Sequence, residues 1–405
     1  MSLNPESSGV ERKVMHAMKA VGNKPRWKGR LVNALVAVVA LAIFMEGGFR
    51  LILSINALRQ RALGFDSASW RLQWVKLHSY HAEWAWTGPF ATYHPTRGWA
   101  VKPGIQNMDV MDGMILNTNS RGLRGTTEYR YQRTPGKQRI LVLGDSFTFG
   151  SEVADDETFS HHLEAGLPHT EVLNMGVQGY GHDQMLLYLK EEGVKYHPDI
   201  VIVGFVYPDI YRSIWRFFAY AKPKFDLVSG DLQLTNVPVP TPVQVLAMER
   251  YRPKALDFLV ILQDKLRWAF GQNEREARSL TKALLNEIVA TTRGIGAVPV
   301  FVYFPVYEEI EPHAHGRSYP LTANSPPIAD RERYFKSICQ DERIHCLFLR
   351  PRFDEEVKRG VDLHPKGHWN AAAHSLAAQE MQNFLVANGL VQKDAVNLQT
   401  HVGQD

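Results

Sequence analysis

From residue 139 onward the chain alternates between short runs of consecutive apolar residues and stretches with helical periodicity. The apolar runs occupy residues 139–144, 171–176, 199–206, 298–305 and 346–349. Mainly apolar runs of this length are typical of strands buried on both faces of a parallel sheet. Amphipathic helices are predicted between and after them, near 158–167, 183–193, 276–293, 331–338 and 371–388. Alternating strands and helices predict an α/β fold of three layers, α/β/α, with helices on both faces of a mostly parallel sheet.

Two regions depart from this alternation. Residues 220–275 contain a hairpin-like FDLVSGDLQL that turns at Gly230, a proline-rich NVPVPTP and a helical segment rich in Leu and Trp, and we interpret them as an insertion. Residues 56–137 are irregular and rich in aromatic side chains, with turn signals such as Lys102-Pro103-Gly104. We therefore expect a main domain over 138–390, a lead-in segment over 56–137 that packs on it, and a C-terminal tail over 391–405.

Near the N-terminus, residues 31–55 form an apolar stretch that is long enough to cross a bilayer, which takes about 20 residues. Glu46 and Arg50 interrupt the stretch at i, i+4 spacing, where they can pair on a helix. Residues 1–30 hold seven Lys or Arg and two Glu. A cleaved signal peptide rarely has so long a basic region, and a core helix rarely has such a flank. We predict an uncleaved anchor in the inner membrane, with residues 1–30 in the cytoplasm and the main domain in the periplasm.

The remaining charges argue against a nucleic-acid partner. Outside residues 1–30 the chain has 39 basic and 40 acidic side chains, so the positive charge is confined to the tail. Cys339 and Cys346 have six residues between them. In an oxidising compartment they can form a disulfide, and two free buried thiols are the alternative. Two thiols at this spacing provide no zinc site, and we expect neither a metal nor a cofactor.

The first apolar run ends in Gly144-Asp145-Ser146, followed by Phe147-Thr148-Phe149-Gly150. A small residue before a serine at a strand-to-helix turn lets the hydroxyl project from the end of the sheet, where backbone N–H groups can face a developing oxyanion. This block resembles the GDS motif that opens the SGNH (GDSL-type) hydrolases, over about residues 139–388 of the chain. The resemblance implies a flavodoxin-like sheet, with Ser146 as nucleophile and as one oxyanion donor.

Two further blocks of that family bear on the oxyanion hole. The sequence VLNMGVQGYGHDQ is similar to the second block, and the resemblance implies that the backbone N–H of Gly179 is an oxyanion donor. The third block normally ends its strand with an Asn followed by Asp, but this chain has Pro208 before Asp209. Proline has no N–H group and no side-chain donor. The loss of one oxyanion donor typically costs about 100- to 1,000-fold in turnover.

The catalytic base is expected in DLHPKGHWNAAAHSLAA, which contains His364, His368 and His374. The family places its histidine just before the last helix, which favours His368, and Asn370 is then the predicted N-cap of that helix. His364 is the alternative base. Asp362 is the candidate that orients the imidazole, although a Ser–His pair assisted by a backbone carbonyl stays open.

Together these features predict a membrane-anchored serine esterase that acts on O-acyl esters through an acyl-enzyme. O-acetyl groups on envelope or exported polysaccharide, or on a small ester, are the expected substrate. Two alternatives remain. A polysaccharide O-acyltransferase uses the same residues, and a non-catalytic glycan-binding or assembly protein is compatible with Pro208 at the position of the Asn.

Overall fold

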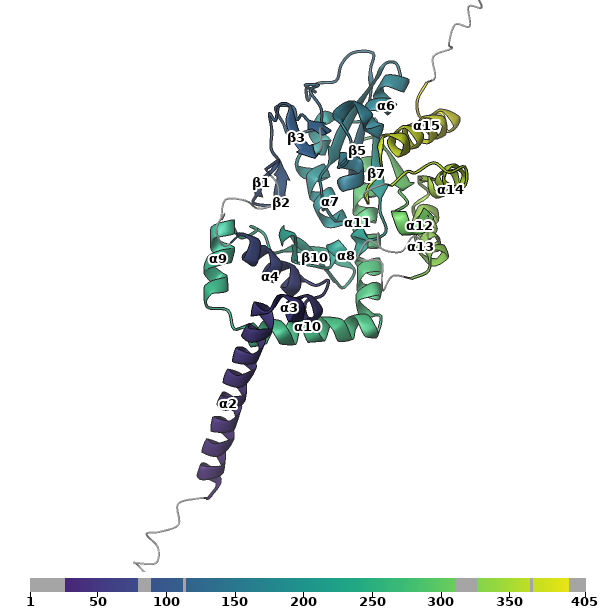
Figure 1. The fold of residues 1–405 in the computed structure, drawn as a ribbon. Coiled ribbons are helices and arrows are strands. Elements are labelled where there is room, and N and C mark those ends of the chain that lie inside the picture. The colour runs from purple at the N-terminus through teal and green to yellow at the C-terminus, as the bar shows by residue number, and fades with distance from the viewer. Residues whose placement is uncertain (1–25, 79–88, 112–113, 311–325, 365–366, 393–405) are drawn as a thin grey trace, which may run out of the picture. The chain divides into compact units, whose positions relative to one another are not determined.

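The computed structural model describes residues 26–78, 89–111, 114–310, 326–364 and 367–392 (Figure 1). The chain divides into two compact units. The first comprises residues 1–63 with 252–260, and the second comprises 64–251 with 261–405. The second unit therefore contains most of the predicted lead-in segment together with the predicted main domain except residues 252–260.

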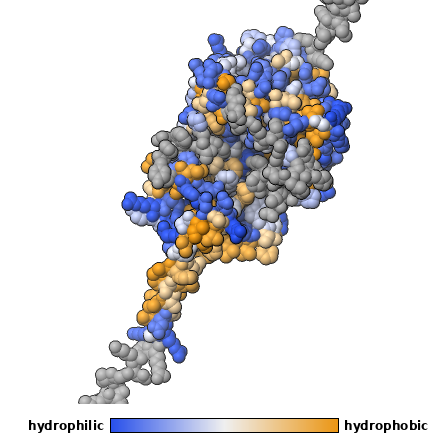
Figure 2. All heavy atoms as spheres, in the orientation of Figure 1, coloured by the Kyte–Doolittle hydropathy of each residue, from blue (hydrophilic) through white to orange (hydrophobic). Residues whose placement is uncertain are grey.

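The first unit contains α2 (Arg26–Ser54), α3 (Asn56–Ala62) and the first turns of α10 (Lys254–Ala269). α2 has 29 residues, which at roughly 1.5 Å per residue gives a length of about 43 Å. Its surface is largely apolar (Figure 2). Near its end the Arg50 Nε donates a hydrogen bond to Glu46 Oε1 at 2.6 Å, which is the expected pair. α2 is thus long and apolar enough to span a membrane.

The second unit is built on one parallel sheet of five strands in the order β13-β12-β7-β5-β6. The strands are β5 (Gln138–Gly144), β6 (Thr170–Gly176), β7 (Ile200–Phe205), β12 (Val298–Tyr303) and β13 (His345–Phe348). In chain order this is 2-1-3-4-5, the flavodoxin-like arrangement. Ligand sites in such sheets lie beyond the C-terminal ends of the strands, at the point where the strand order reverses, and that point is next to β5.

Successive residues of each strand face opposite layers of helices. Leu141 and Leu143 of β5 belong to one buried core, and Ile140 and Val142 belong to the other. The first core includes residues of α7 (His182–Glu191), α11 (Gln272–Gly294) and α13 (Ile328–Glu342). The second includes residues of α6 (Phe159–Gly166), α14 (Arg350–Lys358) and α15 (Ala371–Ala387), and α6 and α15 pack together (Figure 1). The predicted three-layer α/β/α fold is confirmed.

Shorter elements complete the two ends of the sheet. They are α5 (Ser146–Phe149), α8 (Asp209–Ser213), α12 (Tyr307–Ile310) and the 3₁₀ turns Asp155–Glu157 and Gly193–Tyr196. α5 follows β5 directly, and α8 follows β7 after three residues. Both begin at the C-terminal ends of their strands, so both help to form the region in which a ligand site is expected.

The lead-in segment is more regular than the sequence predicts. It contains α4 (Ser67–His78) and two hairpins, in which β1 (Ala91–His94) pairs with β2 (Gly98–Val101) and β3 (Met108–Met111) pairs with β4 (Met114–Leu116). Strands this short offer too few positions for an alternating pattern to stand out. Side chains of both hairpins are buried in the first core, so these hairpins pack on the sheet domain within the second unit.

A small hairpin pairs β8 (Phe217–Phe218), just before the predicted insertion, with β9 (Tyr220–Ala221) at its start. The insertion continues with β10 (Lys224–Val228), β11 (Asp231–Thr235), α9 (Pro242–Arg250) and α10. β10 pairs with β11 through a turn at Ser229 and Gly230, both with positive φ, where the sequence predicted a turn. Pro242, the last of the three prolines after this hairpin, lies in the first turn of α9, where the missing N–H carries no cost.

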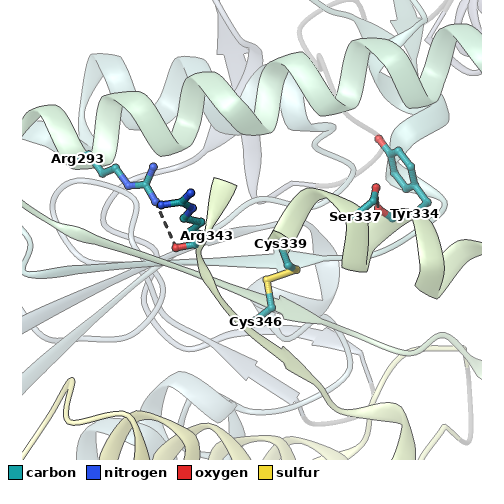
Figure 3. The surroundings of a disulfide bond; sticks show 6 residues. All are labelled: Arg293, Tyr334, Ser337, Cys339, Arg343 and Cys346. Atoms are coloured by element: carbon teal, nitrogen blue, oxygen red, sulfur yellow. Dashed lines mark hydrogen bonds between the residues drawn. A yellow bond between two sulfur atoms is a disulfide. The ribbon is translucent and has the colours of Figure 1, made fainter. Parts of the chain in front are cut away.

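Cys339 and Cys346 form a disulfide that joins the last turn of α13 to β13 (Figure 3). Their Cα atoms lie 6.2 Å apart. In the same region Arg293, at the end of α11, donates a hydrogen bond to the backbone oxygen of Glu342 at 2.6 Å. Of the two states that the sequence left open, the structure contains the disulfide, and it fastens the edge strand of the sheet to its covering helix.

Burial lowers the pKa of His182, His364 and His374 to about 3 in each case. The folded protein therefore keeps these imidazoles neutral, whereas the unfolded chain protonates them below about pH 6.5. Unfolding then takes up protons, so stability falls as the pH is lowered from 6.5 toward 3. We expect the free energy of unfolding to drop by about 2 kcal/mol for each histidine at pH 5.

Urea unfolding of the detergent-solubilised chain between pH 7.5 and 5 measures this dependence. His364→Leu removes one of the three groups and should reduce the loss of stability between these pH values. His161→Leu, at an exposed position of α6, is the matched control. Stability that is independent of pH over this interval would contradict neutral burial of the three rings.

Candidate active site

Ser146 lies at the C-terminal end of β5, where the chain turns into α5. Asp145 is the N-cap of α5, and its Oδ1 accepts a hydrogen bond from the N–H of Phe147 at 3.0 Å. The turn needs glycine before it, because a Cβ on Gly144 would lie 1.9 Å from the Thr148 hydroxyl oxygen. The Ser146 side chain thereby stands at the end of the sheet, in the first turn of the helix.

His368 lies in the loop before α15, as predicted from the sequence. Asn370 is the N-cap of that helix, and its side chain accepts a hydrogen bond from the N–H of Ala373 at 3.0 Å. Next to His368, the Trp369 ring is fully buried, and its Nε1–H donates to the backbone oxygen of Pro305 at 3.1 Å. A buried anchor on one side and a helix cap on the other give the imidazole a defined position.

The structure brings Ser146 and His368 together across 222 residues of sequence, with 2.9 Å between Ser146 Oγ and His368 Nε2. On the other side of the ring, His368 Nδ1 lies 3.0 Å from Glu152 Oε1. A carboxylate that accepts a hydrogen bond from Nδ1–H leaves Nε2 as the acceptor for the serine hydroxyl. Serine, imidazole and carboxylate thus form a continuous hydrogen-bonded chain, the geometry of a Ser-His-acid triad.

Glu152 reaches His368 from the loop that follows α5. The Arg124 guanidinium holds this loop by donating to the backbone oxygens of Phe149, at 2.8 Å, and Val153, at 2.6 Å. Arg124 Nε also pairs with Asp155 Oδ1 at 2.9 Å. Arg124 belongs to the lead-in segment and is almost fully buried. The lead-in therefore supports the segment that carries the third member of the triad geometry.

Asp362, the residue predicted to orient the imidazole, has different partners. Its Oδ1 accepts a hydrogen bond from the N–H of His364 at 3.0 Å, and its backbone oxygen accepts one from the Asn370 side chain at 2.8 Å. The side chain is exposed and shapes the loop, whereas the carboxylate next to His368 is that of Glu152. The physical reason is that the carboxylate comes from the strand-to-helix connection that carries Ser146, and not from the loop that carries the histidine.

His364, the alternative base, is buried among aromatic rings. The rings of Phe147 and Phe353 have centroids 6.4 Å and 6.3 Å from its own. Burial lowers the pKa of His364 to about 3, so this imidazole is neutral at physiological pH. The Ser146 Oγ lies 2.9 Å from His368 Nε2 and 3.3 Å from Asp145 Oδ2, so His364 is part of the core beneath the site.

Gly179 lies in the turn that follows β6 and has a φ of 75°, a conformation that favours glycine. Several contacts hold this turn. The Trp99 Nε1–H donates to the backbone oxygen of Gln178 at 2.9 Å, and Arg212 Nη1 donates to that of Tyr180 at 3.0 Å. The Gln178 side chain donates to Ser151 Oγ at 2.7 Å, which connects the turn to the loop after α5.

Pro208, at the position where an asparagine was expected, is the N-cap residue of α8. One turn later, Arg212 Nη1 lies 3.1 Å from Asp145 Oδ2 and 2.6 Å from Asp209 Oδ1, and all three side chains are buried. Burial raises the pKa of Asp209 well above its ordinary value. Arg212 thus connects the aspartate of the GDS block to the turn that carries Gly179, through its bond to Tyr180.

A cavity of about 340 Å³ opens next to the triad geometry. Ser146, Glu152, Gly179, Arg212 and His368 all line it. The cavity reaches the solvent, and the His368 side chain is 26% exposed, so a small molecule has access to the serine hydroxyl. Among the residues that the structure describes, no group of three or more His, Cys, Asp or Glu side chains is arranged to hold a metal ion.

No protein-family model matches the sequence, and no curated protein matches it. Several solved structures are similar to the chain. A catalytic mutant of the acetylxylan esterase Axe2 from Geobacillus stearothermophilus has 14% identity and a TM-score of 0.38, with 63% of this chain and 96% of that chain covered. The acetyl xylan esterase AlAXEase has 10% identity, a TM-score of 0.38, and coverage of 60% and 98%. A member of the lipolytic G-D-S-L family from Veillonella parvula has 10% identity, a TM-score of 0.35, and coverage of 61% and 97%.

Three residues around the serine escaped the sequence interpretation. Glu152 lies six positions after Ser146 in a stretch with several acidic side chains, and nothing in the local pattern distinguishes it from its neighbours. Arg124 belongs to a segment that was expected to be irregular. Arg212 follows Pro208 by one helical turn, so a search for a substitute donor near the missing asparagine would have found it.

Proposed function

We propose that this protein is a serine ester hydrolase of the SGNH type, with Ser146 as nucleophile, His368 as general base and Glu152 as the acid that orients the imidazole. One observation carries the proposal. It is the hydrogen-bonded chain from Ser146 Oγ through both nitrogens of His368 to Glu152, at 2.9 Å and 3.0 Å, on the wall of an open cavity. The GDS motif and the flavodoxin-like sheet support the same family.

In the proposed mechanism His368 Nε2 takes the proton from the Ser146 hydroxyl while Oγ attacks the carbonyl carbon of an ester. The carbonyl π electrons move to the oxygen, which becomes the oxyanion of a tetrahedral intermediate. Collapse of the intermediate breaks the bond to the alcohol oxygen, and the alcohol leaves with the proton from His368. Water then attacks the acyl-enzyme with His368 again as base, and it releases the acid and the free serine.

The oxyanion needs donors, and we infer that the backbone N–H groups of Ser146 and Gly179 provide them. Among the described residues, neither of these N–H groups donates a backbone hydrogen bond. Pro208 removes the third donor of the family. Arg212 contacts both Asp145, next to the nucleophile, and Tyr180, next to Gly179. In our proposal it positions the two remaining donors and favours the developing negative charge.

Transfer of the acyl group to a sugar hydroxyl in place of water would use the same residues, so an O-acyltransferase is the second form of this proposal. We further propose that α2 anchors the protein in the inner membrane with its basic flank in the cytoplasm. The sheet domain would then face the periplasm, where O-acylated envelope or exported polysaccharide is the first class of substrate to test.

A fluorophosphonate probe tests the proposal directly, because it phosphonylates only a serine that an adjacent base activates. We expect the full chain in detergent to be labelled at Ser146, as identified by mass spectrometry of its peptides. Heat-denatured protein should remain unlabelled. Failure of the native protein to label would contradict both the hydrolase and the acyltransferase, and it would favour a binding protein.

A further inference from the structure

The cavity beside Ser146 has an extended apolar wall. Its members come from three different parts of the chain, namely the lead-in segment, α5 and β8, which lies just before the insertion. They are Phe90, Val110, Met114, Leu116, Phe149 and Phe218. The polar groups of the cavity, among them Ser146, Glu152 and His368, form the remaining wall. The cavity therefore has one polar wall, which carries the candidate catalytic residues, and one apolar wall. This division suits a ligand with a polar end and an apolar end.

Secondary structure and ring contacts hold the residues of the apolar wall in place. β4 directs alternate side chains to opposite faces, so Met114 and Leu116 line this cavity whereas Ile115 between them lines a different one. Leu116 is fully buried. The Phe90 and Phe149 rings stack with their centroids 6.3 Å apart, which joins the lead-in to α5. Met114 is half-buried and has an adaptable side chain that can follow the shape of a flexible ligand.

The cavity is much larger than an acetyl group. Its volume of about 340 Å³, at roughly 30 Å³ for each water-sized group, accommodates on the order of ten non-hydrogen atoms. An acetyl ester would place a single methyl group against the apolar wall and leave most of the wall without contacts. The size and the chemistry of this wall therefore match a hydrocarbon chain.

We propose that this cavity binds the acyl chain of the ester, and that the preferred chain has about six to eight carbons. The inference rests on the proposed function for the position of the ester carbonyl at Ser146, and it replaces the acetyl group expected from the sequence with a longer apolar acyl group. The alcohol leaves on the polar side, where His368 donates its proton. Each added methylene that enters the cavity should raise kcat/KM about fourfold.

The test compares p-nitrophenyl acetate, butyrate and octanoate as substrates of the full chain in detergent. We expect kcat/KM to rise with chain length up to octanoate. Met114→Trp fills part of the apolar wall and should lower the ratio of kcat/KM for octanoate to kcat/KM for acetate at least tenfold. Ile115→Trp makes a similar change in size at the neighbouring position on the other face of β4, and it should keep the wild-type preference.

The outcomes separate this inference from the proposed function. Hydrolysis of acetate without any gain for octanoate, or equal effects of the two tryptophan variants, would overturn the acyl site and leave the esterase intact. If no ester is hydrolysed, the proposed function fails, and calorimetric binding of octanamide to the wild-type chain and both variants then tests the cavity. Binding that Met114→Trp alone removes would uphold the acyl site, and the absence of binding to the wild type would overturn it.

Discussion

Replacement of Ser146 by alanine should lower kcat for a p-nitrophenyl ester by about 10⁴- to 10⁶-fold, the largest effect we expect from any single substitution. In the proposed mechanism the Ser146 Oγ forms the acyl-enzyme, and His368 Nε2, which lies 2.9 Å from it, activates the hydroxyl. The side chain is small and lines a cavity, so its removal should leave the melting temperature nearly unchanged. Steady-state kinetics and thermal unfolding of the same preparation measure both quantities.

Two further variants make this result specific. His368→Ala should cost nearly as much as Ser146→Ala, and the double variant should lose little more, because the two groups act as one unit. Ser120→Ala, at an exposed serine that contacts Glu128, is the control. If the loss of kcat in the double variant equals the product of the two single losses, then Ser146 and His368 act independently, contrary to the proposed mechanism.

Glu152→Gln should lower kcat by about 10³- to 10⁴-fold while KM changes little. The carboxylate oxygen lies 3.0 Å from His368 Nδ1. In the proposed mechanism it selects the tautomer whose Nε2 accepts the serine proton, and it stabilises the imidazolium that follows. Glutamine has the same shape, but it lacks the negative charge and can present a donor to Nδ1. The kinetic parameters of the variant with p-nitrophenyl butyrate test this expectation.

Asp362→Asn is the matched comparison, because it makes the same chemical change at the acid predicted from the sequence. Asp362 accepts hydrogen bonds within its own loop and is exposed, so this substitution should change kcat by only a few fold. A large loss of kcat in Asp362→Asn with a small loss in Glu152→Gln would refute the proposed triad. It would indicate that Asp362 is the acid that orients the His368 imidazole.

Several features of the site and fold could be predicted because their signals are local. A strand buried on both faces is mainly apolar, which is why β5, β6, β7, β12 and β13 could be located within a few residues. The GDS block placed Ser146 at the end of β5, since a tight strand-to-helix turn requires a residue such as Gly144 without a side chain. Asn370 was predictable as a helix cap for the same reason, because capping depends on residues within one turn.

Features that depend on contacts between distant segments could not be predicted in this way. The buried clamp of Arg124 on the loop after α5 joins residues 25 to 29 positions apart, through a segment whose short hairpins leave no clear periodicity. The state of Cys339 and Cys346 depended on whether α13 and β13 would bring the two side chains together, and the sequence left both states open. The proposed acyl site is another example, because its wall combines the lead-in, α5 and β8.

By itself, the sequence determined the order of strands and helices, the apolar N-terminal helix and the candidate pair of Ser146 and His368. Only the tertiary structure decided which carboxylate stands behind the imidazole, how Arg212 connects Asp145 to the turn at Gly179, and how large the cavity is. The physical reason is the separation along the chain of the residues that interact. Backbone turns and buried strands depend on neighbours along the chain, whereas a hydrogen bond or a cavity depends on side chains that meet only after the sheet has formed and its loops have packed.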